Sequence, residues 1–280
     1  MIEIKQLTKK YGDFTAVDHL DLTIKTGEFF GLLGPNGAGK TTTISMLSTV
    51  LLPTSGEILI DGNKLDRKAS AEKRKFSVIT QEYSMRQDMT MDEVMEYQGR
   101  LYYMKKKEIR EKSDELLAFT GLIDYRHRVV RHLSGGMKRK LMICRALMTD
   151  PEILLLDEPT AGMDAISRRQ MWNLLRQLHS RNITILLTTH YIDEAQSLCD
   201  RVALIDHGKL DTVDAPQTLI DHLGAFAVDI TTEERLVSKY FATKRDAIDY
   251  LSGSDEDMTM RNTTLEDVFV ERIGRRIDQK

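Results

Sequence analysis

Short runs of apolar residues, separated by turn residues, dominate the first sixty positions of the chain. Strand-forming residues recur at Ile2–Ile4, Leu20–Ile24, Phe29–Leu33 and Ile58–Ile60, which predicts four β-strands. After the third run, a glycine-rich turn leads into Lys40–Leu51, where apolar residues recur at helical spacing. The pattern therefore predicts a strand, a loop and a helix in succession.

The pattern changes between about residues 92 and 149, where the apolar spacing is helical and strand formers are few. We interpret this segment as a helical subdomain, about residues 82–150, inserted after a strand at Phe76–Thr80. Strands and helices then alternate at Ile153–Leu156, Ile166–Ser180, Ile183–Thr188, Ile192–Leu198 and Arg201–Ile205. Such alternation predicts an α/β fold in which helices cover both faces of a parallel sheet.

The last quarter of the chain has a different character. His207-Gly208-Lys209 predicts the tight turn of a closing hairpin. Beyond about residue 224 the sequence is mixed and polar, and Ser252–Asp257 predicts an exposed loop. We therefore expect a principal domain at residues 1–224 and a small accessory region at residues 225–280, with no internal repeat.

Composition and charge limit the classes of partner. A chain of 280 residues with 41% hydrophobic content can bury a substantial core. The formal net charge of −3 gives no overall attraction to nucleic acid, so we expect no nucleic-acid partner. The basic stretches Lys64–Lys75, Lys105–Lys112 and Arg126–Lys140 are interpreted as solvated helix faces.

The sequence offers no segment for crossing a membrane. Its longest apolar runs, such as Ile153–Leu156, fall far short of the roughly 20 residues that a spanning helix needs. Met1–Lys5 lacks the apolar segment of a secretory signal, so we expect an unprocessed cytosolic chain. Cys144 and Cys199 lie in apolar helical contexts, which predicts buried thiols rather than a disulfide or a metal site.

The first candidate for chemistry is the loop Gly34–Thr41, which reads Gly-Pro-Asn-Gly-Ala-Gly-Lys-Thr and fits the phosphate-binding pattern G-x-x-x-x-G-K-[ST]. Its backbone N–H groups and the following helix N-terminus would bind phosphate. Lys40 would bind the β- and γ-phosphates, and the Thr41 hydroxyl would ligate Mg²⁺. A flexible turn could match by accident, but the predicted strand before and helix after it favour the nucleotide site.

A second candidate is the end of the apolar strand Ile153–Leu156, where Asp157 and Glu158 follow directly. Asp157 is placed to hold magnesium, and Glu158 to polarise an attacking water. The simpler alternative is an exposed acidic turn after a core strand.

A third candidate lies between these two, at Leu133-Ser134-Gly135-Gly136-Met137. Ser134 is a good helix N-cap, and the two glycines leave the first N–H groups unobstructed, which predicts a second anion-binding helix start. Taken alone, such a segment is usually just a loop.

Together with Gln81 and His190, these three segments occur in the order and at the distances found in ABC transporter ATPases, and residues 1–224 resemble that family. The resemblance implies a P-loop NTPase core with an antiparallel β subdomain and an inserted α-helical subdomain. It also implies ATP and Mg²⁺ as cofactors, and ATP hydrolysis coupled to transport across a membrane.

The resemblance further implies roles for single residues. Tyr11 is similar to the aromatic residue that stacks on adenine, and Val17 to a residue beside base and ribose. The implied catalytic residues are Glu158, His190 and Gln81, and the implied magnesium ligands are Thr41, Gln81 and Asp157. The implied phosphate-binding residues are Gly34, Pro35, Asn36, Gly37, Ala38, Gly39, Lys40, Thr41 and Thr42.

Partners follow from the same resemblance. Two cassettes of the family pack head to tail, so Ser134, Gly135 and Gly136 would complete the ATP site of a second copy, and Asp164 would lie in the loop that crosses to it. We expect a homodimer of cassettes, separate membrane-spanning permease subunits, and a location on the cytoplasmic face of a bacterial inner membrane.

The chain departs from the family pattern at Met137, where glutamine is usual, and at Ala161 and Met163, where serine and leucine are usual. These departures and the tail Thr264–Val270 resemble the branch that serves bacterial exporters of drugs, lipids, polysaccharides or modified oligosaccharides. Three alternatives remain at this point: a soluble ABC ATPase acting on nucleic acid or the ribosome, an ATP-gated regulatory module, and an importer cassette.

Overall fold

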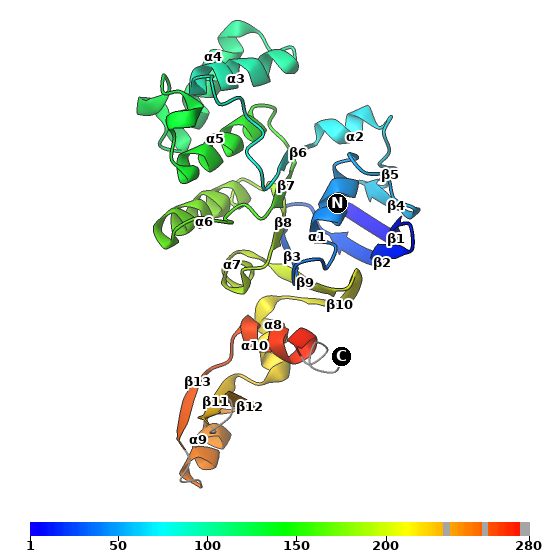
Figure 1. Ribbon diagram of the computed structural model, residues 1–280, viewed down its shortest axis with the longest axis vertical. Coiled ribbons are helices and arrows are strands. Elements are labelled where there is room, and N and C mark those ends of the chain that lie inside the picture. Colours follow the sequence, from blue (N-terminus) through cyan, green and yellow to red (C-terminus); the bar gives the residue numbers. More distant parts are fainter. Residues whose placement is uncertain (232–235, 254–256, 275–280) are drawn as a thin grey trace.

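The computed structural model describes residues 1–231, 236–253 and 257–274, arranged as an elongated molecule around one central sheet (Figure 1). This sheet has six strands in the order β10-β9-β3-β8-β7-β6. All neighbours in it are parallel except β9 and β10, which form the predicted closing hairpin. The strands are β3 (Phe29–Leu33), β6 (Phe76–Ile79), β7 (Ile153–Asp157), β8 (Thr184–Thr189), β9 (Arg201–Asp206) and β10 (Lys209–Asp214).

Every residue of β3, β7 and β8 is buried, because both faces of the sheet are covered. On one face, side chains such as Phe29 and Leu154 pack with α5 (Gly135–Leu147), α6 (Ala165–His179) and α7 (Ile192–Leu198). On the other, Phe30 and Leu155 pack with α1 (Lys40–Leu47) and with a second sheet. The α/β fold is therefore confirmed.

The second face differs from the prediction of helices on both sides, because an antiparallel sheet covers much of it. This sheet has the strand order β2-β1-β4-β5 and comprises β1 (Ile2–Tyr11), β2 (Phe14–Ile24), β4 (Ser55–Ile60) and β5 (Asn63–Lys64). Its alternating residues Ile2, Ile4 and Ile58 face the core, so one side of the sheet is apolar. This is the antiparallel β subdomain that the family resemblance implied.

The predicted helical insertion is also confirmed. After the short α2 (Ser70–Arg74) and β6, the chain forms α3 (Met91–Leu101), α4 (Lys106–Phe119), two 3-10 turns (Ile123–Tyr125 and Val130–His132) and then α5. Thr90 and Glu93 form a reciprocal capping box at the start of α3, which fixes where this helix begins. Helices α3 and α4 lie at the top of the molecule in Figure 1.

The first helix is shorter than predicted and ends at Leu47 rather than Leu51. Thr49 adopts a positive φ of 58°, which a continuing right-handed helix cannot contain. Both cysteines are free and buried, as expected, and burial raises the pKa of the Cys144 thiol to about 12. Among the described residues, no helix combines the length and the apolar character needed to cross a bilayer.

The chain beyond the central sheet forms a small unit with its own core, at the bottom of Figure 1. After α8 (Pro216–Leu223), the strands β11 (Phe226–Thr231), β12 (Leu236–Phe241) and β13 (Met258–Asn262) pair in the order β12-β11-β13. Helix α9 (Lys244–Ser252) packs on one face of this sheet through Ala247, against Val228 and Ile230. The predicted loop Ser252–Asp257 lies partly outside the described residues.

The last described segment returns to the principal domain. Leu265 and Val268 of α10 (Leu265–Phe269) and Ile273 of the following turn (Val270–Gly274) are almost fully buried in the same core cluster as Leu219 and Ile220 of α8. The C-terminal unit is therefore attached to the principal domain at both its ends. The boundary at residue 224 stays a prediction.

Candidate nucleotide site

The glycine-rich loop joins β3 to α1, and its glycines are required by geometry. Gly37 and Gly39 have φ angles of 83° and 100°. A Cβ atom on Gly34 would lie 2.3 Å from the Ile205 carbonyl oxygen, and one on Gly39 would lie 2.5 Å from that of Ala16. Larger residues therefore cannot occupy these positions without moving the backbone, and the N-terminus of α1 stays open to an anion.

Lys40, the first residue of α1, is buried beneath this loop. Its Nζ donates hydrogen bonds to the carbonyl oxygens of Gly34 at 2.8 Å and Pro35 at 3.0 Å. Burial lowers the pKa of Lys40, and the neighbouring Glu158 and Asp157 carboxylates partly oppose this effect. A phosphate on the loop would supply the nearby negative charge that a buried ammonium group requires.

The carboxylate of Asp157 connects the end of β7 to α1. Its Oδ1 accepts hydrogen bonds from the hydroxyls of Thr41 at 3.2 Å and Thr188 at 2.5 Å. Two of the three predicted magnesium ligands are thus in direct contact, and the third, Gln81, lines the adjoining cavity. Hydroxyl, carboxylate and amide oxygens are hard donors that fit Mg²⁺ bound together with substrate phosphates.

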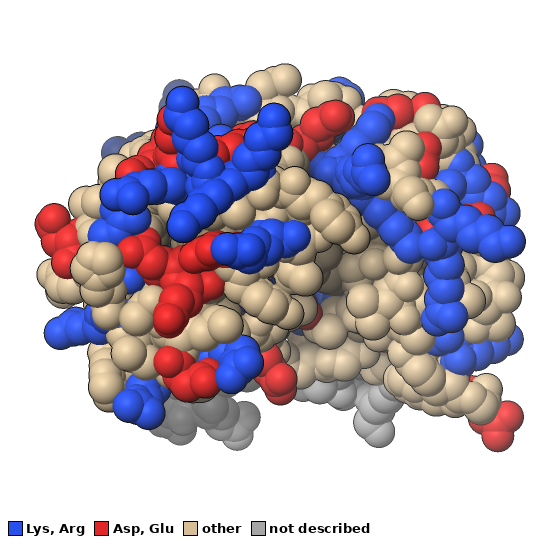
Figure 2. Space-filling view, turned by 90° about the horizontal axis from the view of Figure 1, so that it is seen from above, with Lys and Arg blue, Asp and Glu red and all other residues tan. Residues whose placement is uncertain are grey.

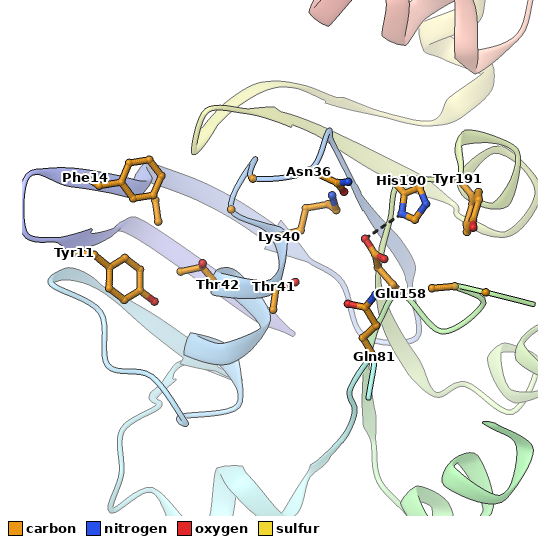
Figure 3. Close-up of a pocket in the computed structure, with 15 residues that line it drawn as sticks. Tyr11, Phe14, Asn36, Lys40, Thr41, Thr42, Gln81, Glu158, His190 and Tyr191 are labelled. Carbon is orange, nitrogen blue, oxygen red and sulfur yellow. Dashed lines mark hydrogen bonds and ion pairs between the residues drawn. The ribbon is translucent and has the colours of Figure 1, made fainter. Parts of the chain in front are cut away.

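Glu158 and His190 form a pair across two neighbouring strands. His190 Nδ1 lies 3.1 Å from Glu158 Oε1. Glu158 has a φ of 47°, and its backbone N–H donates to the Thr188 carbonyl at 3.0 Å, which holds the turn after β7. A non-glycine residue in this conformation is uncommon and recurs at functional sites. Here it aims the carboxylate toward the cavity (Figure 3).

These side chains surround one cavity of about 630 Å³, a volume typical of sites for small organic ligands. In Figure 3 the aromatic rings of Tyr11 and Phe14 stand on one side of α1, and Gln81, Glu158 and His190 stand on the other. The lining residues are Tyr11, Phe14, Ala16, Asn36, Gly37, Gly39, Lys40, Thr41, Thr42, Gln81, Glu158, Ala161, Gly162, His190 and Tyr191.

Five of these lining residues were not predicted: Phe14, Ala16, Ala161, Gly162 and Tyr191. Phe14 pairs with Tyr11 across a tight hairpin, a relationship that the register of the two strands could have indicated. Val17 is 1% exposed beneath the phosphate loop, and its neighbour Ala16 lines the cavity instead. Gly34, Pro35 and Ala38 belong to the loop but not to the lining.

Ser134, Gly135, Gly136 and Asp164 do not line this cavity. Ser134 caps α5 by accepting from the Met137 N–H, and Asp164 caps α6 by accepting from Ile166 and Ser167. A Cβ on Gly136 would lie 3.3 Å from Ser167 Oγ, so the two helix starts are neighbours. Ser134 and Gly135 are exposed, so they are open to a second molecule.

A buried arginine that sequence reasoning missed connects α5 to the loop of Gln81. Arg139 is 2% exposed, and its guanidinium donates to the carbonyl oxygens of Thr80 at 2.7 Å and Gln81 at 3.0 Å. The Tyr83 hydroxyl in turn donates to the Gly135 carbonyl at 3.3 Å. The backbone of Gln81 is thus tied to the helix that begins at Ser134.

Comparison of the sequence with known proteins identifies the family of the chain. Residues 17–161, more than half of the chain, match the family model described as ABC transporter. The chain belongs to the ABC transporter family. The daunorubicin resistance ATP-binding protein DrrA3 of Streptomyces coeruleorubidus is 34% identical over 305 residues, which cover 98% of this chain and 96% of that protein. Nod factor export ATP-binding protein I of Cupriavidus metallidurans is 38% identical over 235 residues, which cover 84% of this chain and 78% of that protein.

Solved ABC cassettes share the fold. The dimeric post-hydrolysis structure of the cassette MJ0796, bound to ADP and Pi, is 29% identical with a TM-score of 0.69, covering 77% of this chain and 98% of that one. CbiO1 of Clostridium perfringens, part of the complex cbiONQ, is 28% identical with a TM-score of 0.72, covering 78% and 89%. This ABC transporter protein is therefore an ATP-binding cassette and an ATPase.

Proposed function

We propose that this cassette hydrolyses ATP with Mg²⁺ in the cavity between Tyr11 and His190, and that it drives a membrane-spanning exporter. The observation that carries the proposal is the convergence of Lys40, Thr41 and the Glu158–His190 pair on one cavity next to a phosphate loop, with Asp157 hydrogen-bonded to Thr41. Each chemical role that γ-phosphate transfer to water requires has a side chain there.

In the proposed mechanism, the loop N–H groups and Lys40 bind the β- and γ-phosphates. Thr41, Asp157 and Gln81 would hold magnesium, which would neutralise phosphate charge there. Glu158 orients and polarises the attacking water. His190, 3.1 Å from the Glu158 carboxylate, fixes the direction of that carboxylate and would also contact the γ-phosphate.

We propose that two cassettes close head to tail on two ATP molecules. The exposed Ser134 and Gly135 and the neighbouring Asp164 lie outside their own chain's cavity, as residues serving a second copy must. The likeness to a dimeric cassette supports this arrangement. Because closed and open pairs bind ATP and ADP differently, nucleotide exchange supplies the free energy for moving a partner.

Dimer closure is tested with the Glu158→Gln variant, which should hold ATP without turnover. Light scattering after size exclusion should give a dimer with ATP and a monomer without nucleotide. Adding Ser134→Arg should abolish the dimer. Adding Ser180→Arg should not, because Ser180 is an exposed residue at the end of α6 that lies opposite Asp164. A dimer that persists in the Ser134→Arg variant would contradict the head-to-tail arrangement.

We propose that the membrane subunit docks at the top of the molecule. There, a hollow of about 640 Å³ lies between Arg74 of α2 and the turn Leu101–Met104 after α3. Tyr103 in this turn is 96% exposed. Figure 2 shows this top surface, which is hollowed between two groups of lysine and arginine side chains. An exposed aromatic residue beside a hollow with mixed polar and apolar lining suits a helix from a permease at the cytoplasmic membrane face.

Export, rather than import, is proposed from relatives named for Nod factor export and daunorubicin resistance. No feature of the described residues favours action on nucleic acid or the ribosome. We also keep residues 1–224 as the cassette and 225–280 as an accessory region, which the separate small core of the C-terminal sheet supports.

The experiment that tests the transporter proposal is detergent co-purification of the tagged chain with ATP, followed by mass spectrometry. A polytopic membrane protein should co-purify. Recovery of this membrane protein should fall with the Tyr103→Asp variant. It should persist with Tyr125→Asp, because Tyr125 is exposed but lies outside the hollow. Recovery of ribosomal or nucleic-acid components alone would contradict a role in transport.

A further inference from the structure

A buried carboxyl lies beneath the nucleotide cavity and has no role in the mechanism above. Glu194, on α7 four positions after His190, is 0% exposed. Its Oε1 accepts hydrogen bonds from Thr160 Oγ1 at 2.9 Å and from the Trp172 indole N–H at 3.0 Å. Its Oε2 is buried without a hydrogen-bond partner among the described residues.

The partners of Glu194 belong to separate parts of the site. Thr160 is 1% exposed and directly precedes Ala161 and Gly162, which line the nucleotide cavity. Trp172 lies on α6, whose first turn is capped by Asp164 of the same loop. Glu194 itself lies on the helix that follows His190. One carboxyl oxygen therefore joins the loop 160–164 to the segment carrying the histidine.

Stability alone does not account for an acid at this position. Among the described residues Glu194 forms no ion pair, although the buried guanidinium of Arg139 is close enough to interact with it electrostatically. Burial raises the pKa of Glu194, and hydrogen bonds from Thr189, Thr160 and Trp172 oppose this effect only in part. An apolar residue would avoid the cost of burying a carboxyl with one unsatisfied oxygen.

We propose that Glu194 is a positioning residue that makes the loop Thr160–Asp164 and the His190 segment move as one unit when the site closes on ATP. The inference rests on the proposed hydrolysis at this site and assigns a residue that acts through others. Nucleotide affinity comes mainly from the phosphate loop, so loss of the link lowers turnover and leaves binding nearly unchanged.

The chain contains a single tryptophan, Trp172, and its indole N–H donates a hydrogen bond to the Glu194 carboxylate. The fluorescence emission of Trp172 therefore reports on the hydrogen bonds of Glu194. In the Glu158→Gln background, addition of Mg²⁺-ATP should change the emission of Trp172. Thr160→Val, which removes one donor at nearly constant volume, should abolish most of that change, while ATP affinity stays within about threefold.

The matched control is Thr120→Val, another buried threonine, whose hydroxyl bonds the Leu116 carbonyl in α4, away from the site. This variant should keep the full ATP-dependent change in emission. If ATP leaves the emission unchanged in the Glu158→Gln parent, or if Thr160→Val responds as that parent does, the proposal is overturned.

Turnover gives the second readout. Thr160→Val should lower kcat about tenfold with KM within about threefold, and Thr160→Ser, which restores the hydroxyl, should recover most of it. A merely structural role would lower the melting temperature without this split between kcat and KM. If the unsubstituted chain bound ATP but did not hydrolyse it, the proposed function would fail. The emission experiment would still test whether Glu194 couples the loop Thr160–Asp164 to the His190 segment.

Discussion

His190 Nδ1 lies 3.1 Å from Oε1 of Glu158, although the two residues are 32 positions apart in the sequence. The parallel pairing of β7 with β8 creates this contact, because both strands end at the same edge of the sheet, with Asp157 opposite Thr188. The contact between the two side chains therefore depends on the strand register.

His190→Ala should lower kcat about a hundredfold while ATP affinity changes little, because the imidazole orients Glu158 more than it anchors the nucleotide. Steady-state hydrolysis and equilibrium ATP binding measure the two effects. His127→Ala removes another histidine paired with an acid, Asp92 at 3.3 Å, outside the site and should retain the parent kcat. Equal loss of turnover in both variants would contradict the assignment.

The aromatic pair at the tip of the first hairpin should contribute to binding of the adenine base. Tyr11 and Phe14 are 50% and 63% exposed and face the cavity from one side. Phe14→Ala should weaken ATP binding about three- to tenfold through lost stacking. Titration with a fluorescent ATP analogue measures this effect, and Tyr125→Ala, outside the cavity, should bind as the parent does. Unchanged affinity in Phe14→Ala would remove Phe14 from the base site.

Asp267 should make stability depend on pH in the acid range. Burial would raise the pKa of Asp267, but hydrogen bonds from Arg261 and Thr264 outweigh it, and the pKa is lowered. An acid with a lowered folded-state pKa stabilises the fold above its unfolded value, about 4, and this contribution disappears as the pH falls below it.

Asp267→Asn should therefore reduce the free energy of unfolding by about 1–3 kcal/mol at pH 7 and by less at pH 3. Urea unfolding followed by circular dichroism at the two pH values measures the difference. Asp249→Asn, whose partner Arg245 is 3.9 Å away and largely exposed, should change little at either pH. An equal loss for Asp267→Asn at both values would contradict the linkage.

Local pattern predicted the parts of the site that lie in one continuous segment. The loop from Gly34 to Thr41 and the carboxylates Asp157 and Glu158 are read directly from glycine spacing and from an apolar strand. Residues that reach the site through tertiary packing carry no such signal. Phe14 depends on hairpin register, and Arg139 and Glu194 on the packing of α5 and α7 against loops far away in sequence.

The fold shows the same division. Fully buried strands such as Phe29–Leu33 were predicted closely, because a continuous apolar run has few alternatives between two covered faces. The sheet β12-β11-β13 was missed, because its strands mix polar residues such as Asp229, Ser238 and Arg261 that form a network only in three dimensions.

ATP binding and hydrolysis by the Glu158→Gln variant decide whether Glu158 is the catalytic carboxylate. The parent protein and Glu152→Gln, a variant at an exposed glutamate before β7, are measured beside it. ATP affinity should stay within about threefold of the parent in both variants, and kcat should fall about a hundredfold or more only in Glu158→Gln. Full ATPase activity in Glu158→Gln would contradict the proposed catalytic site.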